Sequence, residues 1–205
     1  MKRKNQILLT IGTIATLTTL LFLGDSFFNS RGSCACKHDK CTSNIDSKNL
    51  NMRGIPIIKR DKYILRGLDI GDYNKGFIDC INEVTEPGVV TQKQFEERYL
   101  SLCKDGCYKI VVAYDPKDEK VIGSGTLFIE KKFIRGCAAK GHIEDVVVLK
   151  EKRGKGIGKD ILETLIWISK KMGCYKTALV CDLKNIEFYK KCGLKEKERE
   201  MVMYH

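Results

Sequence analysis

Hydrophobic and polar positions form short, regular patterns from about residue 63 to the end of the chain. Residues 142–149 are a largely apolar run that predicts a buried strand, and apolar positions at helical spacing predict a helix over residues 160–172. The same criteria predict a mixed order of strand, two helices, three strands, helix, strand, helix and strand. The other predicted strands are 63–68, 108–114, 121–129, 175–181 and a last one reaching 205, and the other helices are 72–83, one opened by a capping box at 91–94, and 185–191.

A glycine-rich turn, residues 153–159, joins the predicted strand at 142–149 to the helix that follows it. Unpaired N–H groups of a first helical turn, together with the helix dipole, make such a corner a seat for an anion. Gly156 and Gly158 would let a phosphate approach the backbone, and Arg153, Lys155 and Lys159 add positive charge. The turn reads R-x-x-G-x-G, which is neither a P-loop nor a dinucleotide fingerprint, and a basic exposed turn is the alternative interpretation.

Composition places the chain among globular proteins, because 43% of its 205 residues are hydrophobic and 31% are charged. The net charge of +11 is uneven: residues 1–60 carry 10 Lys/Arg against 3 Asp/Glu, and residues 61–205 carry 27 against 23. The predicted domain is therefore only mildly basic, which suits a small anionic substrate and argues against nucleic-acid binding.

The first sixty residues predict an appendage rather than part of the domain. Residues 1–6 are basic, and residues 7–24 are 18 residues without a charge, about 27 Å long as a helix. A single-pass membrane anchor, possibly in an endomembrane, is preferred to a cleaved signal peptide because the apolar run is long for a signal. Residues 25–61 read as a flexible linker and 62–205 as the domain; the side of the membrane that the domain faces stays open.

Ten cysteines are present, and seven lie inside the predicted domain, where several occupy apolar strands or helices as reduced cysteines usually do. The linker holds Cys34, Cys36, His38 and Cys41, a set that could ligate zinc. It lacks the second pair of ligands of the usual structural sites, so a tether or lipid-modified cysteines are favoured and no metal is predicted.

Several motifs in this order resemble one known family. They are Val84–Val90, Lys132-Phe133-Ile134, Gly141–Val148, the turn at Arg153–Lys159, Gly173–Lys176, Asn185 and Phe188–Gly193. Residues 63–205 are similar to the GNAT acetyltransferase superfamily and, within it, to the glucosamine 6-phosphate N-acetyltransferases. The resemblance implies an α+β (α/β) GNAT fold, with a mixed, mostly antiparallel sheet flanked by helices and splayed at the acetyl-CoA site. It also implies a homodimer that acetylates glucosamine 6-phosphate for UDP-N-acetylglucosamine biosynthesis.

The resemblance also implies roles for individual residues. Acetyl-CoA would be held by Val146, Val147, Val148, Arg153, Gly154, Lys155, Gly156, Ile157, Gly158, Lys159, Asn185, Tyr189 and Lys190. The sugar phosphate would be held by Thr85, Lys132, Phe133, Ile134, Arg135, Glu144, Asp145 and Glu200. Catalysis would fall to Glu144 and Asp145 beside the attacking amine and to Tyr189 as the acid for the leaving thiolate.

Each of these roles has a structural alternative. Glu144 and Asp145 could instead pin an irregular strand, Tyr189 could be a packed core residue, and Lys132 and Arg135 could be a solvated charged face. His142 is expected to be satisfied by packing or a hydrogen bond and is left out of catalysis.

One position departs from the family pattern. Val180 stands where the family usually has an acid that binds sugar hydroxyls across the dimer interface. Asp182 would lie on the same face if the strand stayed regular. A GNAT enzyme for another amine, such as a polyamine or a protein, and a non-catalytic CoA-binding membrane module therefore remain alternatives.

Overall fold

The computed structural model describes residues 50–51, 54–85 and 88–205. The predicted membrane segment 7–24 and the cysteine cluster at 34–41 lie outside these residues. Within the described part of the chain, none of the helices combines the length and the apolar character that crossing a membrane would need.

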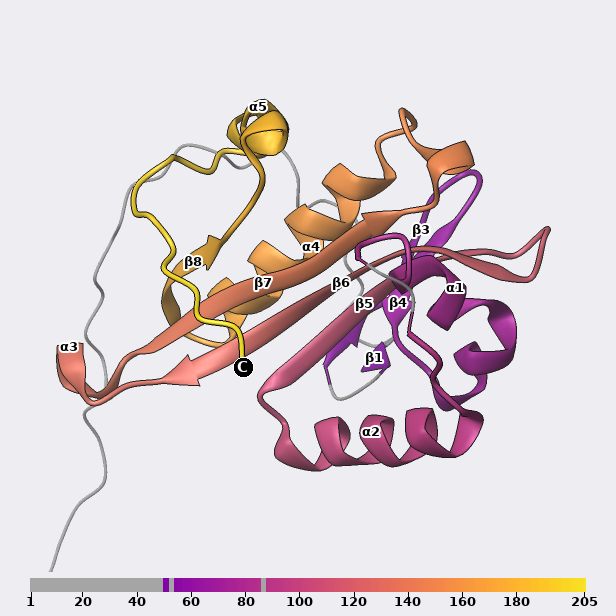
Figure 1. Ribbon diagram of the computed structural model, residues 1–205, viewed down its shortest axis with the longest axis horizontal. Helices are drawn as coiled ribbons and strands as arrows, with labels where there is room; N and C mark the ends of the chain where they lie inside the picture. The colour runs from indigo at the N-terminus through magenta and orange to yellow at the C-terminus, as the bar shows by residue number, and fades with distance from the viewer. Residues whose placement is uncertain (1–49, 52–53, 86–87) are drawn as a thin grey trace, which may run out of the picture. The chain divides into compact units, whose positions relative to one another are not determined.

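A six-stranded sheet forms the centre of the described fold (Figure 1). Its strand order is β3 (Ile58–Lys59), β4 (Ile64–Gly67), β5 (Tyr108–Asp115), β6 (Lys120–Lys131), β7 (Ala139–Val148) and β8 (Cys174–Leu179). Neighbours pair antiparallel from β3 to β7, and only β7 and β8 run parallel. The predicted mixed, mostly antiparallel sheet is confirmed.

Helices cover the sheet. The helical elements are η1 (Ile70–Lys75), α1 (Phe77–Ile81), α2 (Gln92–Asp105), α3 (Ile134–Cys137), η2 (Lys150–Lys152), α4 (Ile157–Lys171), η3 (Leu183–Asn185) and α5 (Ile186–Lys191). Helix α4 crosses β6, β7 and β8 and buries Ile161, Leu162 and Leu165. Its packing leaves no room for side chains below it, because a Cβ on Gly125 of β6 would lie 2.9 Å from Ile161 and from Leu165.

Local signals set the helix ends. Thr91 and Gln94 form the predicted capping box, in which each side chain bonds to the backbone of the other residue, and α2 begins at Gln92. The single helix predicted over residues 72–83 is wrong, since η1 and α1 are separated there by Gly76 in the left-handed conformation, with φ 76°. The loop predicted from residue 136 is short, because β7 already starts at Ala139.

The described fold begins before the predicted domain boundary at residue 62. Ile55 of β2 (Ile55–Pro56) and Ile58 of β3 are 0% and 6% exposed, and β3 pairs with β4 at the edge of the sheet. Strands of two residues show no alternation that a sequence pattern could reveal, so they were assigned to the linker.

The last predicted strand is absent. Residues 192–205 contain no helix or strand, and Met201, Met203 and Tyr204 are 93%, 79% and 92% exposed. A strand needs a neighbour that completes its backbone hydrogen bonds, and the edge strand β8 pairs within the described chain with β7 alone. The described part of the chain therefore provides no strand partner for this apolar segment.

A buried ion pair fastens η1 to the sheet. The Asp72 side chain is 0% exposed, and its two oxygens accept from Nη1 and Nη2 of Arg66 in β4, both at 2.7 Å. The Asp69 backbone N–H also donates to Asp72, at 2.9 Å. This pair orients the segment that leads into α1.

We expect Asp72→Ala to lower the free energy of unfolding by about 3–5 kcal/mol, because it leaves the Arg66 guanidinium half-buried without its partner. Urea unfolding of both proteins measures the change. Glu97→Ala is the control, since its pair with Lys93 is exposed and 4.0 Å long and should contribute less than about 1 kcal/mol. Equal losses in the two variants would contradict the prediction.

Candidate active site

The strand β7 loses its parallel neighbour halfway along its length. Its register with β8 ends at Ile143, which lies opposite Leu179, the last residue of β8. On the other side, Glu144, Val147 and Val148 keep their pairing with β6. The backbone groups of Val146 and the N–H of Val148 therefore lack a strand partner on this side, whereas the Val148 carbonyl accepts from Arg153. The predicted splay of the sheet is confirmed.

A bulge interrupts β7 where the two strands separate. Glu144 lies opposite Thr126 and Val147 opposite Ser124, so Asp145 and Val146 share one position on β6. Asp145 takes a left-handed conformation with φ 53°, which costs about 1–3 kcal/mol for a residue other than glycine. The bulge turns the side chains of the two neighbouring acids out of the sheet's alternation and leaves both exposed.

Burial and neighbouring charges raise the pKa of Glu144, one of the two acids at the bulge. Reduced hydration raises the pKa of Glu144, and the negative charges of Asp145 and Glu200 raise it further, while His142 opposes the shift. Glu200, from the end of the chain, is thus within electrostatic reach of the bulge. A carboxylate whose pKa is raised accepts a proton more readily than an ordinary glutamate does.

The glycine turn lies directly beyond β7. Gly154 and Gly156 have φ 77° and 82°, and a Cβ on either would meet no atom within 4 Å. Gly156 is the N-cap residue of α4, and no side chain caps this helix end. The first N–H of the helix that donates to a backbone carbonyl is that of Asp160, which donates to Gly156. The N–H groups of residues 157–159 are therefore available at the positive end of a 15-residue helix, which fits a diphosphate.

The basic side chains of the turn are not equally available. Arg153 donates from Nε to the Val148 carbonyl at 2.8 Å and from Nη2 to Glu83 at 3.0 Å. Lys155 reaches only the Glu151 carbonyl, at 3.5 Å, and Lys159 lies 3.7 Å from Glu163. The two lysines are free to follow a ligand, whereas Arg153 is already oriented by the fold.

Tyr189 enters the site from α5. Its side chain is half-buried against the core, and this burial, with smaller contributions from Cys181 and Cys192, raises the pKa of the phenol. The hydroxyl has no hydrogen-bond partner among the described residues, so it is a protonated donor ready for a ligand. A Cβ on Gly158 would lie 3.5 Å from both Phe188 and Val148, which places α5 beside the turn and the end of β7.

Two other predicted acetyl-CoA contacts lie on the same part of the chain. Asn185 is exposed at the N-cap of α5 and has no side-chain bond at that cap, while Lys190 pairs with Glu187 at 3.0 Å. The structure therefore brings together the bulge, the turn and α5 as the resemblance implied.

The predicted sugar-phosphate residues at 132–135 lie elsewhere. They occupy the far end of the β6–β7 hairpin, where the N–H of Lys132 donates to Ala138. Lys132 follows Thr126, the partner of Glu144, by six positions, which is about 20 Å along a strand. A single chain therefore does not bring Lys132, Phe133, Ile134 and Arg135 to the bulge.

Side chains at this far end have partners of their own. Glu130 forms an ion pair with Lys132 and lies 2.6 Å from Nε2 of His142, and the pKa of Glu130 falls to about 2 as a result. His142 thus has the hydrogen bond expected of a residue outside the chemistry. Arg135 lies over the Tyr175 ring at 5.0 Å, while Phe133 is 95% exposed.

Asp182 does not replace the missing acid at position 180 in the way that a regular strand would allow. β8 ends at Leu179, Val180 is exposed, and Asp182 precedes η3 and pairs with Lys184 at 2.8 Å. The expected alternation is wrong there because the chain has already left the sheet.

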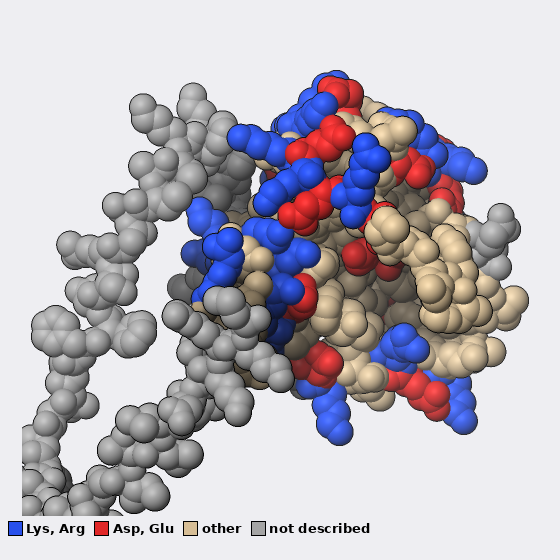
Figure 2. Space-filling view, turned by 60° about the vertical axis from the view of Figure 1, so that its left-hand side comes forward, with Lys and Arg blue, Asp and Glu red and all other residues tan. Residues whose placement is uncertain are grey.

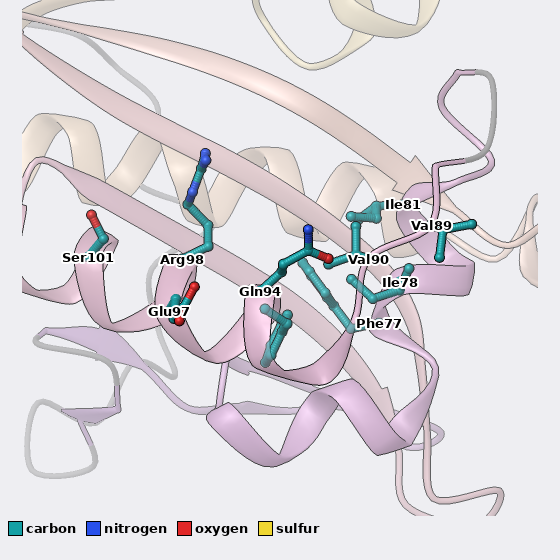
Figure 3. A pocket seen from close by; sticks show the side chains of 10 residues that line it. Phe77, Ile78, Ile81, Val89, Val90, Gln94, Glu97, Arg98 and Ser101 are labelled. Atoms are coloured by element: carbon teal, nitrogen blue, oxygen red, sulfur yellow. The ribbon is translucent and has the colours of Figure 1, made fainter.

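A groove of about 560 Å³ lies between α1, α2 and residues 89–90 (Figure 3). Its floor is apolar, with Phe77, Ile81 and Val90, and Gln94 and Arg98 of α2 line its rim. None of its lining residues was predicted for either substrate. Thr85, the remaining predicted sugar contact, is exposed in the segment between α1 and this groove.

Sequence reasoning missed Glu83. Its carboxylate accepts from the N–H of Lys150 at 3.1 Å as well as from Arg153, although these residues lie 67 and 70 positions away. No local pattern marks such a pair. Metal ligation has no candidate in the described part of the chain, where no three His, Cys, Asp or Glu side chains gather. The seven cysteines described there form no disulfide.

Charges of both signs cover the outside of the domain. Figure 2 shows acidic side chains set among the basic ones on one face, in keeping with the nearly balanced charge of residues 61–205. Local arrangements such as the turn, rather than a broad basic surface on this face, provide the positive charge for a small anion.

We expect the pKa of Glu144, followed by carbon-13 NMR of its carboxyl group, to lie above the ordinary glutamate value. The carboxylate is lost as the pH falls through this raised pKa. Asp145→Asn removes the neighbouring negative charge and should lower the pKa of Glu144, whereas His142→Gln should raise it. A pKa of Glu144 that is the same in all three proteins would contradict this electrostatic picture.

Comparisons with known proteins agree with this geometry. Residues 77–194 match the acetyltransferase (GNAT) family. Glucosamine 6-phosphate N-acetyltransferase 1 of Dictyostelium discoideum is 43% identical over 145 residues, which are 70% of this chain and 92% of that protein. The enzyme named glucosamine 6-phosphate N-acetyltransferase from Arabidopsis thaliana is 40% identical over 145 residues, 70% of this chain and 97% of that one.

Solved structures give the same result. The crystal structure of glucosamine-6-phosphate N-acetyltransferase from Arabidopsis thaliana superposes with a TM-score of 0.69 at 40% identity, covering 70% of this chain and 99% of that one. The predicted resemblance is thereby confirmed, and the protein is an acetyl-CoA-dependent N-acetyltransferase. With its splayed strand, its R-x-x-G-x-G turn and these relatives, the chain belongs to the acetyltransferase (GNAT) family.

Proposed function

We propose that this protein transfers the acetyl group of acetyl-CoA to the 2-amino group of D-glucosamine 6-phosphate, a step that supplies UDP-N-acetylglucosamine biosynthesis. The observation that carries the proposal is the bulged, half-unpaired β7 ending in the glycine turn, in a chain 40–43% identical to relatives named for this reaction.

Acetyl-CoA fits along β7 and the turn. Its diphosphate is bound by the N–H groups of residues 157–159 and by Arg153, Lys155 and Lys159, and its pantetheine arm pairs with the backbone of Val146 and the N–H of Val148. A backbone N–H of this stretch then faces the thioester carbonyl. A fixed donor directed at the developing oxyanion commonly lowers the activation free energy by about 3–4 kcal/mol.

The amine attacks the thioester directly. A carbon–nitrogen bond forms and the carbon–sulfur bond breaks, so no covalent enzyme intermediate arises. The ammonium proton passes to Glu144 or Asp145, directly or through a water or a backbone carbonyl. The thiolate of CoA takes a proton from the Tyr189 hydroxyl, whose raised pKa keeps it protonated until the leaving group appears. After the attack the nitrogen loses its second proton to solvent, and solvent returns a proton to the Tyr189 phenolate.

A homodimer would complete this site. The hairpin end with Lys132 and Arg135 lies about 20 Å from the bulge of its own chain, too far for one sugar phosphate to touch both. A two-fold partner can bring its own hairpin end to the bulge, because the same surfaces then meet twice. The exposed apolar residues Met201, Met203 and Tyr204 also lack a cover from the described part of their own chain.

Membrane attachment through residues 7–24 is also a proposal, carried by the uncharged run and the basic residues before it. Alkaline carbonate extraction of membranes from cells that express the full chain tests it. Release of all the protein into the supernatant would refute attachment by a spanning segment.

Thiol release from acetyl-CoA tests the reaction. We expect release with glucosamine 6-phosphate, much less with glucosamine because Lys132 and Arg135 then lack a phosphate, and none with spermidine. Release with spermidine alone would favour another amine as acceptor. No release with any amine, despite acetyl-CoA binding, would indicate a non-catalytic binding module.

Tyr189→Phe should lower kcat at least about tenfold while changing acetyl-CoA affinity little, because only the proton for the thiolate is lost. Steady-state kinetics and calorimetric binding of acetyl-CoA measure the two effects. Tyr99→Phe is the matched control, since Tyr99 is also half-buried with its pKa raised, to about 12, but lies on α2. An unchanged kcat in Tyr189→Phe would remove this hydroxyl from the mechanism.

Mixing two inactive variants tests whether the site is shared between chains. One carries Glu144→Gln at the bulge, and the other carries Lys132→Ala with Arg135→Ala at the hairpin end. If partners share sites, half of the randomly mixed dimers hold one intact site, and about a quarter of the activity returns. No recovery after subunit exchange, shown by sedimentation to yield dimers, would place the whole site in one chain.

A further inference from the structure

Glu83 connects two parts of the site that are far apart in the sequence. It follows α1, and its side chain is 21% exposed. Its carboxylate accepts from the Lys150 N–H at 3.1 Å and 3.4 Å and forms an ion pair with Arg153 Nη2 at 3.0 Å. The segment after α1 is thereby bonded to η2 and to the first residue of the glycine turn.

Arg153 is held from two sides by these contacts. Nε donates to the Val148 carbonyl at 2.8 Å and Nη2 to Glu83, while Nη1 has no partner among the described residues. These two acceptors orient the guanidinium, and Arg153 is itself the first residue of the glycine turn. A cation oriented in advance loses less entropy when it binds a phosphate.

The segment that contains Glu83 also contains a residue predicted to contact the amino sugar. The Asn82 side chain donates to the Gly88 carbonyl at 3.4 Å and accepts from the Gly88 N–H at 3.3 Å. Thr85, predicted to contact the sugar, lies between these two residues. Beyond them, Val89 and Val90 line the groove beside α2 (Figure 3). Glu83 is thus the contact between the Thr85 segment and the turn.

We propose that Glu83 is a positioning residue that couples the diphosphate seat to the acceptor-side segment, so that CoA bound at the turn steadies residues 82–85. The coupling rests on the proposed binding of acetyl-CoA at the turn. A diphosphate at Nη1 of Arg153 adds a third contact to a side chain that is 52% exposed, and the ion pair passes this added restraint to Glu83 and its backbone. A segment already ordered by one ligand costs the second ligand less to bind, so the two substrates favour each other.

Hydrogen exchange of the full-length protein, with and without saturating CoA, tests the coupling. We expect CoA to slow amide exchange of residues 82–85 at least about fivefold in the wild type and less than about twofold in Glu83→Ala. Glu83→Gln should keep part of the effect, since its amide oxygen still accepts from Lys150 and Arg153. Calorimetry confirms that CoA occupies each variant.

Asp118→Ala is the matched control. Asp118 accepts from Lys152 at 2.8 Å, so this change loosens η2 from its other side without touching Glu83. It should retain the full CoA effect, because η2 alone does not carry the coupling. Equal slowing in the wild type and in Glu83→Ala, or no slowing in the wild type, would overturn the proposal.

The result of the hydrogen-exchange test does not depend on which amine accepts the acetyl group. A protein that fails to acetylate glucosamine 6-phosphate yet shows the CoA effect only with Glu83 present would refute the proposed acceptor and keep the coupling. A protein that acetylates glucosamine 6-phosphate but whose amide exchange at residues 82–85 is unchanged by CoA would support the proposed acceptor and refute the coupling.

Discussion

The site depends on one strand that cannot satisfy its own backbone. β7 is paired on both sides up to Ile143, and beyond it pairs with β6 alone, through Glu144, Val147 and Val148. Unpaired backbone groups inside a protein cost free energy unless a ligand or water bonds to them. The strand therefore offers an extended ligand the hydrogen bonds of a missing neighbour, and the glycine turn at its end offers an anion seat in line with them.

The bulge is the second part of this arrangement. An uninterrupted strand would place Glu144 and Asp145 on opposite faces of the sheet. With Asp145 at φ 53° and two residues opposite one on β6, the alternation shifts and both acids lie exposed where β8 departs. Gly125, which lies opposite the bulge on β6, is packed so closely against Ile161 and Leu165 of α4 that a side chain there would have no space.

Distance along the hairpin explains why a single chain holds only part of the proposed site. The bulge, the turn and α5 converge, because β7, α4 and α5 meet at one end of the sheet. The cations at 132 and 135 stay at the other end, where Glu130 and Tyr175 already occupy them. In the proposed dimer, a partner chain supplies the phosphate-binding group near the bulge, and the exposed apolar side chains of Met201, Met203 and Tyr204 suit such an interface.

The sequence by itself determined the features that local chemistry controls. A glycine-rich turn between a buried strand and an amphipathic helix, the capping box at Thr91 and the strands β5, β6 and β7 all follow from residue types at short spacing. Motifs in a fixed order also predicted the family and the splayed sheet. Tertiary structure decided what depends on distant partners: the break at Gly76, the buried strands β2 and β3, and the pairing of Glu83 with Arg153. It also decided that residues 192–205 form no strand, because strand formation requires a neighbouring backbone, and no pattern within a segment can show whether one is present.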